Sequence, residues 1–396
     1  MCVFWIHTTV LLAAVITTAQ TYWLSLGFQQ DVLMHNGYQS DQGEAPGGPL
    51  GPPDSRDEFC KDLRGLSKGQ SKLCLLYEDH MPHVGRGALM GIEECQYQFR
   101  DMKWNCSTTH DDSVLGPVLN QGSKETAFAH AIAAAGVVHT VARACRDGNL
   151  RSCGCSNEER PNNLHKEWIW GGCGDNIAYG YRFTEGFVDL PEREQKYGKN
   201  TPQQGKKLMN LHNNEVGRRG YDGPNCVRSF VNSKIEQISR RDKSVIRAMR
   251  LTCKCHGVSG SCSVITCWKQ LSPFRAVGEH IRNKYDLATQ VKLNKRGRLQ
   301  VRSKRHIRTP TADDLIFIKD SPDYCTFNST AGSFGTRDRR CNKASNGPDG
   351  CSQMCCGRGY TTKRMKVKER CKCKFQWCCY VECKTCTNIV EITTCK

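Results

Sequence analysis

The stretch Cys253–Trp268 reads CKCHGVSGSCSVITCW and sets small residues between four closely spaced cysteines. Three interpretations fit it. Cys253, Cys255 and His256 offer soft ligands at a short spacing that suits zinc. Ser259 lies in GVSG, a partial match to the G-x-S-x-G turn that carries the nucleophile of serine hydrolases. Disulfides would instead make the stretch a stapled hairpin tip that presents its serine to another molecule.

The third interpretation needs two cysteine pairs, Cys255 with Cys262 and Cys253 with Cys267. They would leave HGVSGS as the tip of a hairpin, where a hydroxyl is accessible from nearly every side. The hydrolase interpretation is weaker, because Ser261 replaces the last glycine of the motif and no strand-turn-helix pattern surrounds it. The compartment of the protein bears on the choice between zinc and disulfides.

The N-terminal sequence indicates that the chain enters the secretory pathway. Residues 1–20, MCVFWIHTTVLLAAVITTAQ, hold a short apolar stretch followed by small residues, which predicts a signal peptide cut near Ala19 or Gln20. In an oxidising compartment, clustered cysteines form disulfides more often than metal sites. The chain has 26 cysteines, and removal of Cys2 with the signal leaves 25, an odd number. We therefore expect a secreted, extracellular protein held by disulfides, with no metal and no cofactor.

The formal net charge of +18 predicts polyanionic partners. The candidates are nucleic acid, an anionic membrane and sulfated glycans, and a secreted chain favours the last two over nucleic acid. The densest basic run, VKLNKRGRLQVRSKRHIR over 291–308, contains no acidic residue. We predict that it binds heparan sulfate through Lys292, Lys295, Arg296, Arg298, Arg302, Lys304, Arg305 and Arg308. Two sequons, at Asn105 and Asn328, predict N-linked glycans.

Composition and periodicity divide the rest of the chain. Residues 21–58 are rich in glycine and proline and predict a flexible arm, with order beginning near Cys60. Helical periodicity dominates residues 59–290, where Ser123 can cap a long helix that ends before Gly148. Further helices are expected over 79–99, 205–219 and 273–287.

The C-terminal part has a different pattern. After a basic linker over 291–318, the domain 319–396 holds 12 cysteines within the 71 residues from Cys325 to Cys395. Alternating side chains predict two strands joined by a short tip near Trp377. Such a segment buries little apolar surface, so disulfides, each worth roughly 2 to 4 kcal/mol, must hold it.

Five motifs of the chain are distinctive: CKCHGVSGSC at 253–262, ECQYQFRDMKWNCS at 94–107, WGGCGDN at 170–176, LHNNEVGRR at 211–219 and CCGRGY at 355–360. Together they resemble the Wnt family of secreted signalling proteins, over a match that begins near Cys60. LHNNEVGRR and the early WLSLG are most similar to the fifth Wnt subgroup. The resemblance implies an α+β fold: a saposin-like helical N-terminal domain with a disulfide-stapled thumb hairpin, 253–267, and a small disulfide-rich C-terminal domain with a β-hairpin.

The resemblance also implies a lipidated ligand. Ser259 would be esterified with palmitoleate by a membrane acyltransferase of the secretory pathway, and a lipid-ligand carrier would accompany the chain. The lipid would enter a groove on the cysteine-rich domain of Frizzled receptors. At about 0.8 kcal/mol per buried CH₂, it represents on the order of 10 kcal/mol of transfer free energy. A second receptor contact, the index finger, maps onto Phe375, Gln376, Trp377, Cys378, Cys379, Tyr380 and Val381.

The family pattern implies the disulfides. Cys378 and Cys379 would pair as neighbours, although adjacent Cα atoms lie about 3.8 Å apart, below the usual disulfide range that starts at about 4.4 Å. The thumb pairs are the two given above. The remaining pairs are Cys60–Cys74, Cys95–Cys106, Cys145–Cys153, Cys155–Cys173, Cys325–Cys356, Cys341–Cys351, Cys355–Cys395, Cys371–Cys386 and Cys373–Cys383.

The chain departs from the family pattern by an insertion of roughly 24 residues over about 220–243, which opens with GYDGP. The glycines and the proline should end the preceding helix. Cys226 lies in this insertion and is left without a partner in the family scheme. We expect a surface loop that leaves the thumb intact.

The sequence therefore predicts a non-catalytic, lipidated and glycosylated Wnt-type ligand that acts in development. The fifth subgroup is often linked to β-catenin-independent signalling. The ligand would bridge Frizzled to a co-receptor of the Ror, Ryk or low-density-lipoprotein-receptor-related type. The alternative is a secreted matrix protein that binds heparan sulfate, for which the basic run is the evidence. Binding to a Frizzled domain separates the two, because heparin would retain both.

Overall fold

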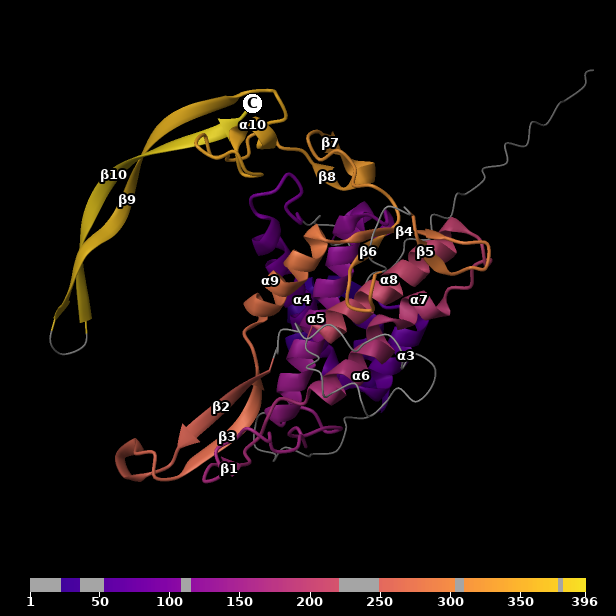
Figure 1. Ribbon diagram of the computed structural model, residues 1–396, viewed down its shortest axis with the longest axis vertical. Coiled ribbons are helices and arrows are strands. Elements are labelled where there is room, and N and C mark those ends of the chain that lie inside the picture. The colour runs from indigo at the N-terminus through magenta and orange to yellow at the C-terminus, as the bar shows by residue number, and fades with distance from the viewer. Residues whose placement is uncertain (1–22, 36–52, 108–114, 221–248, 303–309, 377–379) are drawn as a thin grey trace, which may run out of the picture.

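The computed structural model describes residues 23–35, 53–107, 115–220, 249–302, 310–376 and 380–396. A bundle of helices forms the body, and two β-hairpins extend away from it (Figure 1). This is the α+β arrangement that the resemblance implies. The predicted signal peptide, 1–20, and nearly all of the predicted insertion, 220–243, lie outside the described residues.

Helix α5, Lys124–Arg146, is the centre of the N-terminal domain and is buried along nearly its whole length. It begins where predicted, because Ser123 is the N-cap and forms a capping box with Thr126. In the described part of the chain, α5 is the one helix long and apolar enough to cross a membrane, and its apolar side chains form the core of the bundle. The helices that pack on it are α4 (Met81–Phe99), α6 (Ile177–Val188), α8 (Pro202–Arg219) and α9 (Phe274–Asp286).

The predicted helices 79–99, 205–219 and 273–287 correspond to α4, α8 and α9, each displaced by less than one turn. Helix α8 ends at Arg219, immediately before the GYDGP of the insertion. The shorter elements of this domain are η1 (Trp23–Phe28), α1 (Gln30–His35), α2 (Pro53–Asp62), α3 (Lys68–Leu76), η2 (Glu78–His80), η3 (Gly116–Asn120), β1 (Ile169–Trp170) and α7 (Leu190–Glu194).

Glycines allow the central helices to approach each other closely. A Cβ atom on Gly136 of α5 would lie 2.1 Å from the carbonyl oxygen of Gly87 on α4. On the α8 side, a Cβ atom on Gly217 would lie 2.0 Å from the carbonyl oxygen of Ala131. Both distances are far below van der Waals contact. The backbones of α4 and α8 therefore approach α5 so closely that only glycine fits at these two positions.

The LHNNEVGRR motif joins α8 to the end of α6. Arg218 is buried, and its guanidinium donates to the Asp189 carboxylate at 2.8 and 3.1 Å and to Glu215 at 2.8 Å. Asn214 donates to the same Asp189 oxygen at 3.0 Å. Each charge is thus paired and hydrogen-bonded, as burial requires.

His130 lies between α5 and α8 and makes folding dependent on pH. Its Nδ1 is 3.1 Å from Asn214 Oδ1, while its buried Nε2 has no hydrogen-bond partner among the described residues. Burial lowers the pKa of His130 to about 4 from an ordinary 6.5. At a pH between these two pKa values, His130 is protonated in the unfolded chain and neutral in the folded chain. Lowering the pH therefore favours the unfolded chain, and the free energy of unfolding falls.

We expect the wild-type protein to lose about 2 kcal/mol more stability than a His130→Gln variant when the pH falls from 7 to 5. Urea unfolding with disulfides intact, at both pH values, measures this difference. Other buried histidines change the free energy of unfolding by the same amount in both proteins, so their effect cancels in the difference. Identical pH dependence in the two proteins would show that folded His130 titrates normally.

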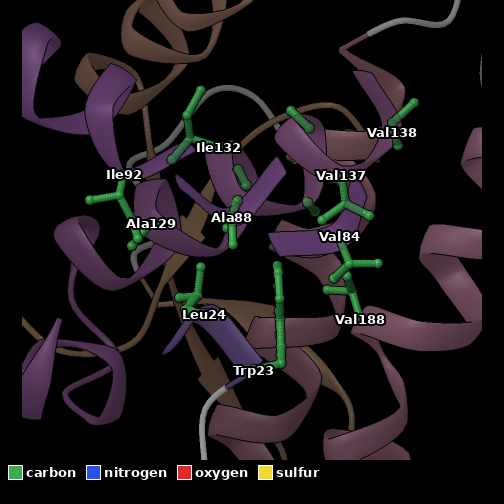
Figure 2. Close-up of a cluster of buried hydrophobic side chains, with 14 of the residues drawn as sticks. Trp23, Leu24, Val84, Ala88, Ile92, Ala129, Ile132, Val137, Val138 and Val188 are labelled. Atoms are coloured by element: carbon green, nitrogen blue, oxygen red, sulfur yellow. The ribbon is translucent and has the colours of Figure 1, made fainter. Parts of the chain in front are cut away.

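The prediction of a flexible arm over 21–58 is wrong for residues 23–35 and at its C-terminal end. Leu26 and Leu33 are fully buried, and η1 and α1 pack against α4. Figure 2 shows Trp23 and Leu24 in one cluster with α4 side chains. The apolar residues of WLSLG cover α4, and the glycine and proline content further along concealed this contact. Order also resumes before Cys60, because α2 begins at Pro53.

The prediction of a linker over 291–318 is also wrong for the described residues 291–302 and 310–318, which are folded. Strands β4 (Thr289–Leu293), β5 (Leu299–Val301) and β6 (Ile316–Phe317) form a three-stranded sheet. Val291 and Ile316 pack with Met209 of α8. The physical reason is a period-2 pattern, in which apolar residues alternate with the cations and face the bundle.

Among its described residues, the C-terminal domain has almost no apolar core, as predicted. Its elements are β7 (Phe327–Asn328), η6 (Ser329–Ala331), β8 (Ser333–Phe334), α10 (Cys351–Met354), β9 (Tyr360–Gln376) and β10 (Tyr380–Cys395). The buried cluster is Met354 with three cysteines. Sulfurs of Cys341, Cys355 and Cys395 lie within 4.8 Å of one another. Each belongs to a disulfide, so none is a thiolate ligand.

The described residues contain 11 disulfides, which coincide with pairs that the resemblance implies. The further pair, Cys378–Cys379, lies outside the described residues, as does Cys226.

Candidate functional site

The opening stretch forms the thumb hairpin, built from β2 (Met249–Cys255) and β3 (Ile265–Leu271). Cys253 lies directly opposite Cys267, and a disulfide joins them across the strands with a Cα–Cα distance of 4.1 Å. A second disulfide, Cys255–Cys262, closes the tip. All four sulfurs are therefore bonded to sulfur and do not provide the thiolates that a zinc site needs.

The tip turns tightly through residues 257–261. Ser259 has a positive φ of 55° and Gly260 a φ of 78°, both in the left-handed region. A Cβ atom on Gly257 would lie 2.4 Å from the carbonyl oxygen of Ser261, so only glycine fits there. Gly257 N donates to the Ser261 carbonyl oxygen at 2.7 Å, and Ser261 N donates to that of Val258 at 3.1 Å. The tip thus closes on itself through its own backbone.

The residues at the tip are exposed. Ser259 and Ser261 are both exposed, and Val258 is 90% exposed beside them. The serine lies in a hairpin turn between two strands, whereas the nucleophile of a hydrolase elbow lies between a strand and a helix. Of the three interpretations, a stapled tip that presents a hydroxyl group agrees with this geometry.

The WGGCGDN motif anchors the base of the thumb, a role that the sequence did not reveal. Gly172 has a positive φ of 79°, and a Cβ atom there would lie 3.0 Å from the Trp268 ring. Asp175 Oδ2 accepts a hydrogen bond of 2.6 Å from Leu271 N, and its Oδ1 lies 2.9 Å from Arg146 at the end of α5. Burial raises the pKa of Asp175. The hairpin is therefore fixed to the central helix.

The second candidate contact lies at the far end of the C-terminal hairpin, β9–β10. Phe375 is 71% exposed and lies directly opposite Val381, which is 59% exposed. Tyr380 is 60% exposed and pairs with Gln376. Disulfides Cys371–Cys386 and Cys373–Cys383 staple the strands just before these residues. Trp377, Cys378, Cys379 and the side chain of Gln376 lie outside the described residues.

The two hairpins leave the body on the same side in the view of Figure 1. Arg339 ties the domains that carry them. Its guanidinium donates to three carbonyl oxygens just beyond α4, those of Met102 at 2.6 Å, Lys103 at 2.7 Å and Arg100 at 2.9 Å. Its own carbonyl oxygen accepts from Cys395 N, at the end of β10, at 2.9 Å. One residue thus links the C-terminal hairpin to the helical domain.

We expect Arg339→Met to lower the free energy of unfolding by about 3 kcal/mol, because three carbonyls lose a charged donor. The exposed neighbour Arg340→Met is the control and should change it by less than about 0.5 kcal/mol. Urea unfolding of the secreted proteins, followed by fluorescence, compares them. Equal stability of the two variants would show that other contacts hold the domains together.

The glycosylation and heparan sulfate residues that the structure describes are exposed or half-buried. Asn328 is exposed at the end of β7, and its Oδ1 accepts from Thr330 N at 3.0 Å. Asn105 is half-buried beside the Cys95–Cys106 disulfide. Of the predicted heparan sulfate residues, Lys304, Arg305 and Arg308 lie outside the described residues, and the exposed ones are Lys292, Lys295, Arg296, Arg298 and Arg302.

Comparison with known proteins identifies the family. A family model described as the wnt family matches residues 62–224 and 221–396, two segments that meet inside the predicted insertion. Wnt-5b of Xenopus laevis is 51% identical over 338 residues, which cover 85% of this chain and 87% of that protein. Wnt-5a of Mus musculus is 49% identical over 385 residues, covering 97% and 90%.

A solved structure shows the same fold. A chain in the structure of human WLS in complex with WNT8A superimposes with a TM-score of 0.52 at 34% identity, covering 80% of this chain and 94% of that one. The stapled hairpins, the motifs and these matches agree. The chain therefore belongs to the Wnt family, within the Wnt-5 subgroup.

Proposed function

We propose that this Wnt signalling ligand is secreted with palmitoleate esterified to Ser259 and binds Frizzled receptors through its two hairpins. The observation that carries the proposal is the thumb tip, where two disulfides hold an exposed serine clear of the body. A membrane acyltransferase needs access to the hydroxyl from outside, and a receptor groove needs access to the attached chain. A tip of small residues provides both.

The lipid gives the ligand its need for carriers. Moving the acyl chain from water into an apolar environment is favourable by on the order of 10 kcal/mol. An acyl group exposed on the ligand therefore needs a carrier or a membrane that shields it from water. The solved relative is described as WNT8A in complex with WLS, and we propose a carrier of that kind for this chain during secretion. At the target membrane the cysteine-rich domain of Frizzled would take over the acyl chain.

The C-terminal hairpin supplies the second contact. Phe375, Tyr380 and Val381 are large, exposed and held by neighbouring staples, which are the properties of a binding hot spot. We propose that they dock on Frizzled together with Gln376, Trp377, Cys378 and Cys379, while a Ror, Ryk or low-density-lipoprotein-receptor-related co-receptor binds elsewhere. N-glycans on Asn105 and Asn328 complete the secreted form.

A second candidate function is binding to heparan sulfate in the extracellular matrix. Five exposed cations of the run 291–308 support it: Lys292, Lys295, Arg296, Arg298 and Arg302. This binding is compatible with the signalling role and would concentrate the ligand near cells.

Purified secreted protein tests the proposal directly. Peptide mass spectrometry should find one acyl ester on the peptide that carries Ser259. The intact protein should bind an isolated Frizzled cysteine-rich domain, and treatment with an esterase that removes O-linked acyl chains should abolish this binding. Unchanged binding after complete removal of the ester would refute the role of the lipid.

A further inference from the structure

A small pocket lies at the base of the thumb, where β1 runs beside β3 (Figure 1). Its volume is about 90 Å³. Three segments of the chain line it: the loop after Cys155, the WGGCGDN motif and strand β3. Its walls include Glu158, Trp170, Gly171, Gly172, Trp268 and Lys269.

Hydrogen bonds and close packing fix the walls of this pocket. Trp170 Nε1 donates to the Glu158 carbonyl oxygen at 2.9 Å, which joins the motif to the loop. The Trp268 ring lies against Gly172, where a Cβ atom would be 3.0 Å from it. The disulfide Cys155–Cys173 ties the same two segments together. The walls are thus in place before a ligand arrives, which lowers the entropic cost of binding one.

An ion pair forms one part of the wall. Lys269 Nζ lies 2.5 Å from Glu158 Oε2, and the two side chains are 31% and 30% exposed, so a ligand can reach both. Lys269 repels a lone cation, and Glu158 repels a lone anion. A small zwitterion can instead pair its anionic group with Lys269 and its cationic group with Glu158 at the same time.

Gly171 keeps the pocket open although packing does not require glycine there. Its φ lies outside the left-handed region. A Cβ atom on Gly171 would meet only methyl groups of Thr266 and Ile169, at 3.9 and 4.0 Å, which is ordinary contact. Gly172, in contrast, has a positive φ of 79° and the Trp268 ring beside it. What the missing side chain of Gly171 provides is space in the pocket.

We propose that this pocket binds a phosphocholine group. The indoles of Trp170 and Trp268 offer the electron-rich surface that attracts a quaternary ammonium ion, and Glu158 adds a negative charge. Lys269 supplies a cation for the phosphate. A primary ammonium, as in phosphoethanolamine, is more strongly hydrated and gains less from the indoles.

The site is independent of the acyl chain. Both thumb disulfides, Cys255–Cys262 and Cys253–Cys267, lie between Ser259 and the pocket along the hairpin. Phosphocholine occurs as the headgroup of phosphatidylcholine and in soluble esters, and the chemistry of the pocket is the same for both.

Binding of phosphocholine to the full-length secreted protein tests the proposal. The protein is kept in octyl glucoside, an uncharged detergent, and saturation-transfer NMR at the choline methyl protons gives the affinity. Gly171→Val places a side chain in the pocket. Gly154→Val is the matched control, because Gly154 is exposed and a Cβ atom there would meet nothing within 4 Å.

We expect Gly171→Val to weaken phosphocholine binding at least about tenfold and Gly154→Val less than about twofold. Mapping of the thumb disulfides and the secreted yield show that each variant is folded. Equal affinity of Gly171→Val and the wild type would overturn the proposal. So would a wild-type protein that binds inorganic phosphate as tightly as phosphocholine.

Glu158→Gln separates a binding role from a structural one. Without the carboxylate, Lys269 is unpaired, so choline should bind more weakly and inorganic phosphate more tightly than in the wild type. A residue that only supports the fold would weaken both, and that result would overturn the proposal. These opposed shifts decide the question even if Gly171→Val is not secreted.

Vesicle flotation identifies the source of the group. Esterase-treated protein, free of its acyl chain, is mixed with vesicles of phosphatidylcholine or of phosphatidylglycerol. If Gly171→Val loses binding to phosphatidylcholine vesicles alone, the ligand is the lipid headgroup. If vesicle binding is unchanged while phosphocholine binding is weakened, the ligand is a soluble phosphocholine ester. Neither result depends on binding to Frizzled, so this test and that of the signalling role can fail separately.

Discussion

Replacing Gly136 with alanine is expected to lower the free energy of unfolding by about 3 kcal/mol or more, although alanine is the better helix former. The added Cβ atom would lie 2.1 Å from the Gly87 carbonyl oxygen, so α4 and α5 must separate. Separation would also weaken the hydrogen bond of 2.7 Å from Thr140 on α5 to the His83 carbonyl oxygen on α4. The added methyl group thus lowers the free energy of unfolding through the packing of α4 on α5.

Gly186→Ala is the matched control. Gly186 is exposed on α6, and a Cβ atom there would meet nothing within 4 Å. The same chemical change should therefore stabilise the protein by roughly 0.5 to 1 kcal/mol, the ordinary gain for alanine over glycine in a helix. Urea unfolding of the secreted proteins and the secreted fraction from cells measure both variants. A Gly136→Ala protein as stable as the wild type would show that the two helices can move apart without cost.

Local signals explain how much of the fold could be predicted. Ser123 caps α5 and Arg219 ends α8, because capping residues and helix breakers act on their own neighbours. The hairpins followed from alternation and cysteine spacing. These features depend on a few residues that lie close together in the sequence.

Features that depend on distant partners could not be predicted in this way. Leu26 and Leu33 looked like part of a flexible arm because the surface they cover, α4, lies some fifty residues away in the sequence. Arg339 is one of several arginines in its segment. The neighbouring sequence does not show that its guanidinium donates to three carbonyl oxygens beyond α4. The pocket at the base of the thumb needs three separate segments of the chain.

The candidate site shows the same division. Cysteine spacing predicted a stapled tip, yet it permitted either Ser259 or Ser261 to carry a lipid. The structure leaves both serines exposed but separates their backbones, because Ser259 has a φ of 55° and Ser261 an extended φ of −61° with ψ of 151°. Choosing Ser259 rests on the family match, so substitution of each serine is the direct test.

Replacing Ser259 with alanine is expected to remove the acyl chain and, with it, secretion and binding to Frizzled. Receptor affinity should fall at least about 100-fold, since even a third of the lipid's transfer free energy of about 10 kcal/mol exceeds the roughly 2.7 kcal/mol to which this change corresponds. The fold should survive, because both thumb disulfides and the tip's backbone hydrogen bonds remain. Mass spectrometry, the ratio of secreted to retained protein, and Frizzled-domain binding give the three readouts.

Two further substitutions separate the hydroxyl from the shape of the tip. Ser259→Gly also removes the hydroxyl, but it adopts the positive φ without strain, so it should behave like the alanine variant. Ser261→Ala removes the neighbouring hydroxyl and should leave acylation, secretion and binding unchanged. If Ser259→Ala failed while Ser259→Gly signalled normally, tip conformation rather than the lipid would matter. If Ser261→Ala alone lost the acyl chain, the acceptor would be Ser261, and the tip would present its lipid from the extended side of the turn.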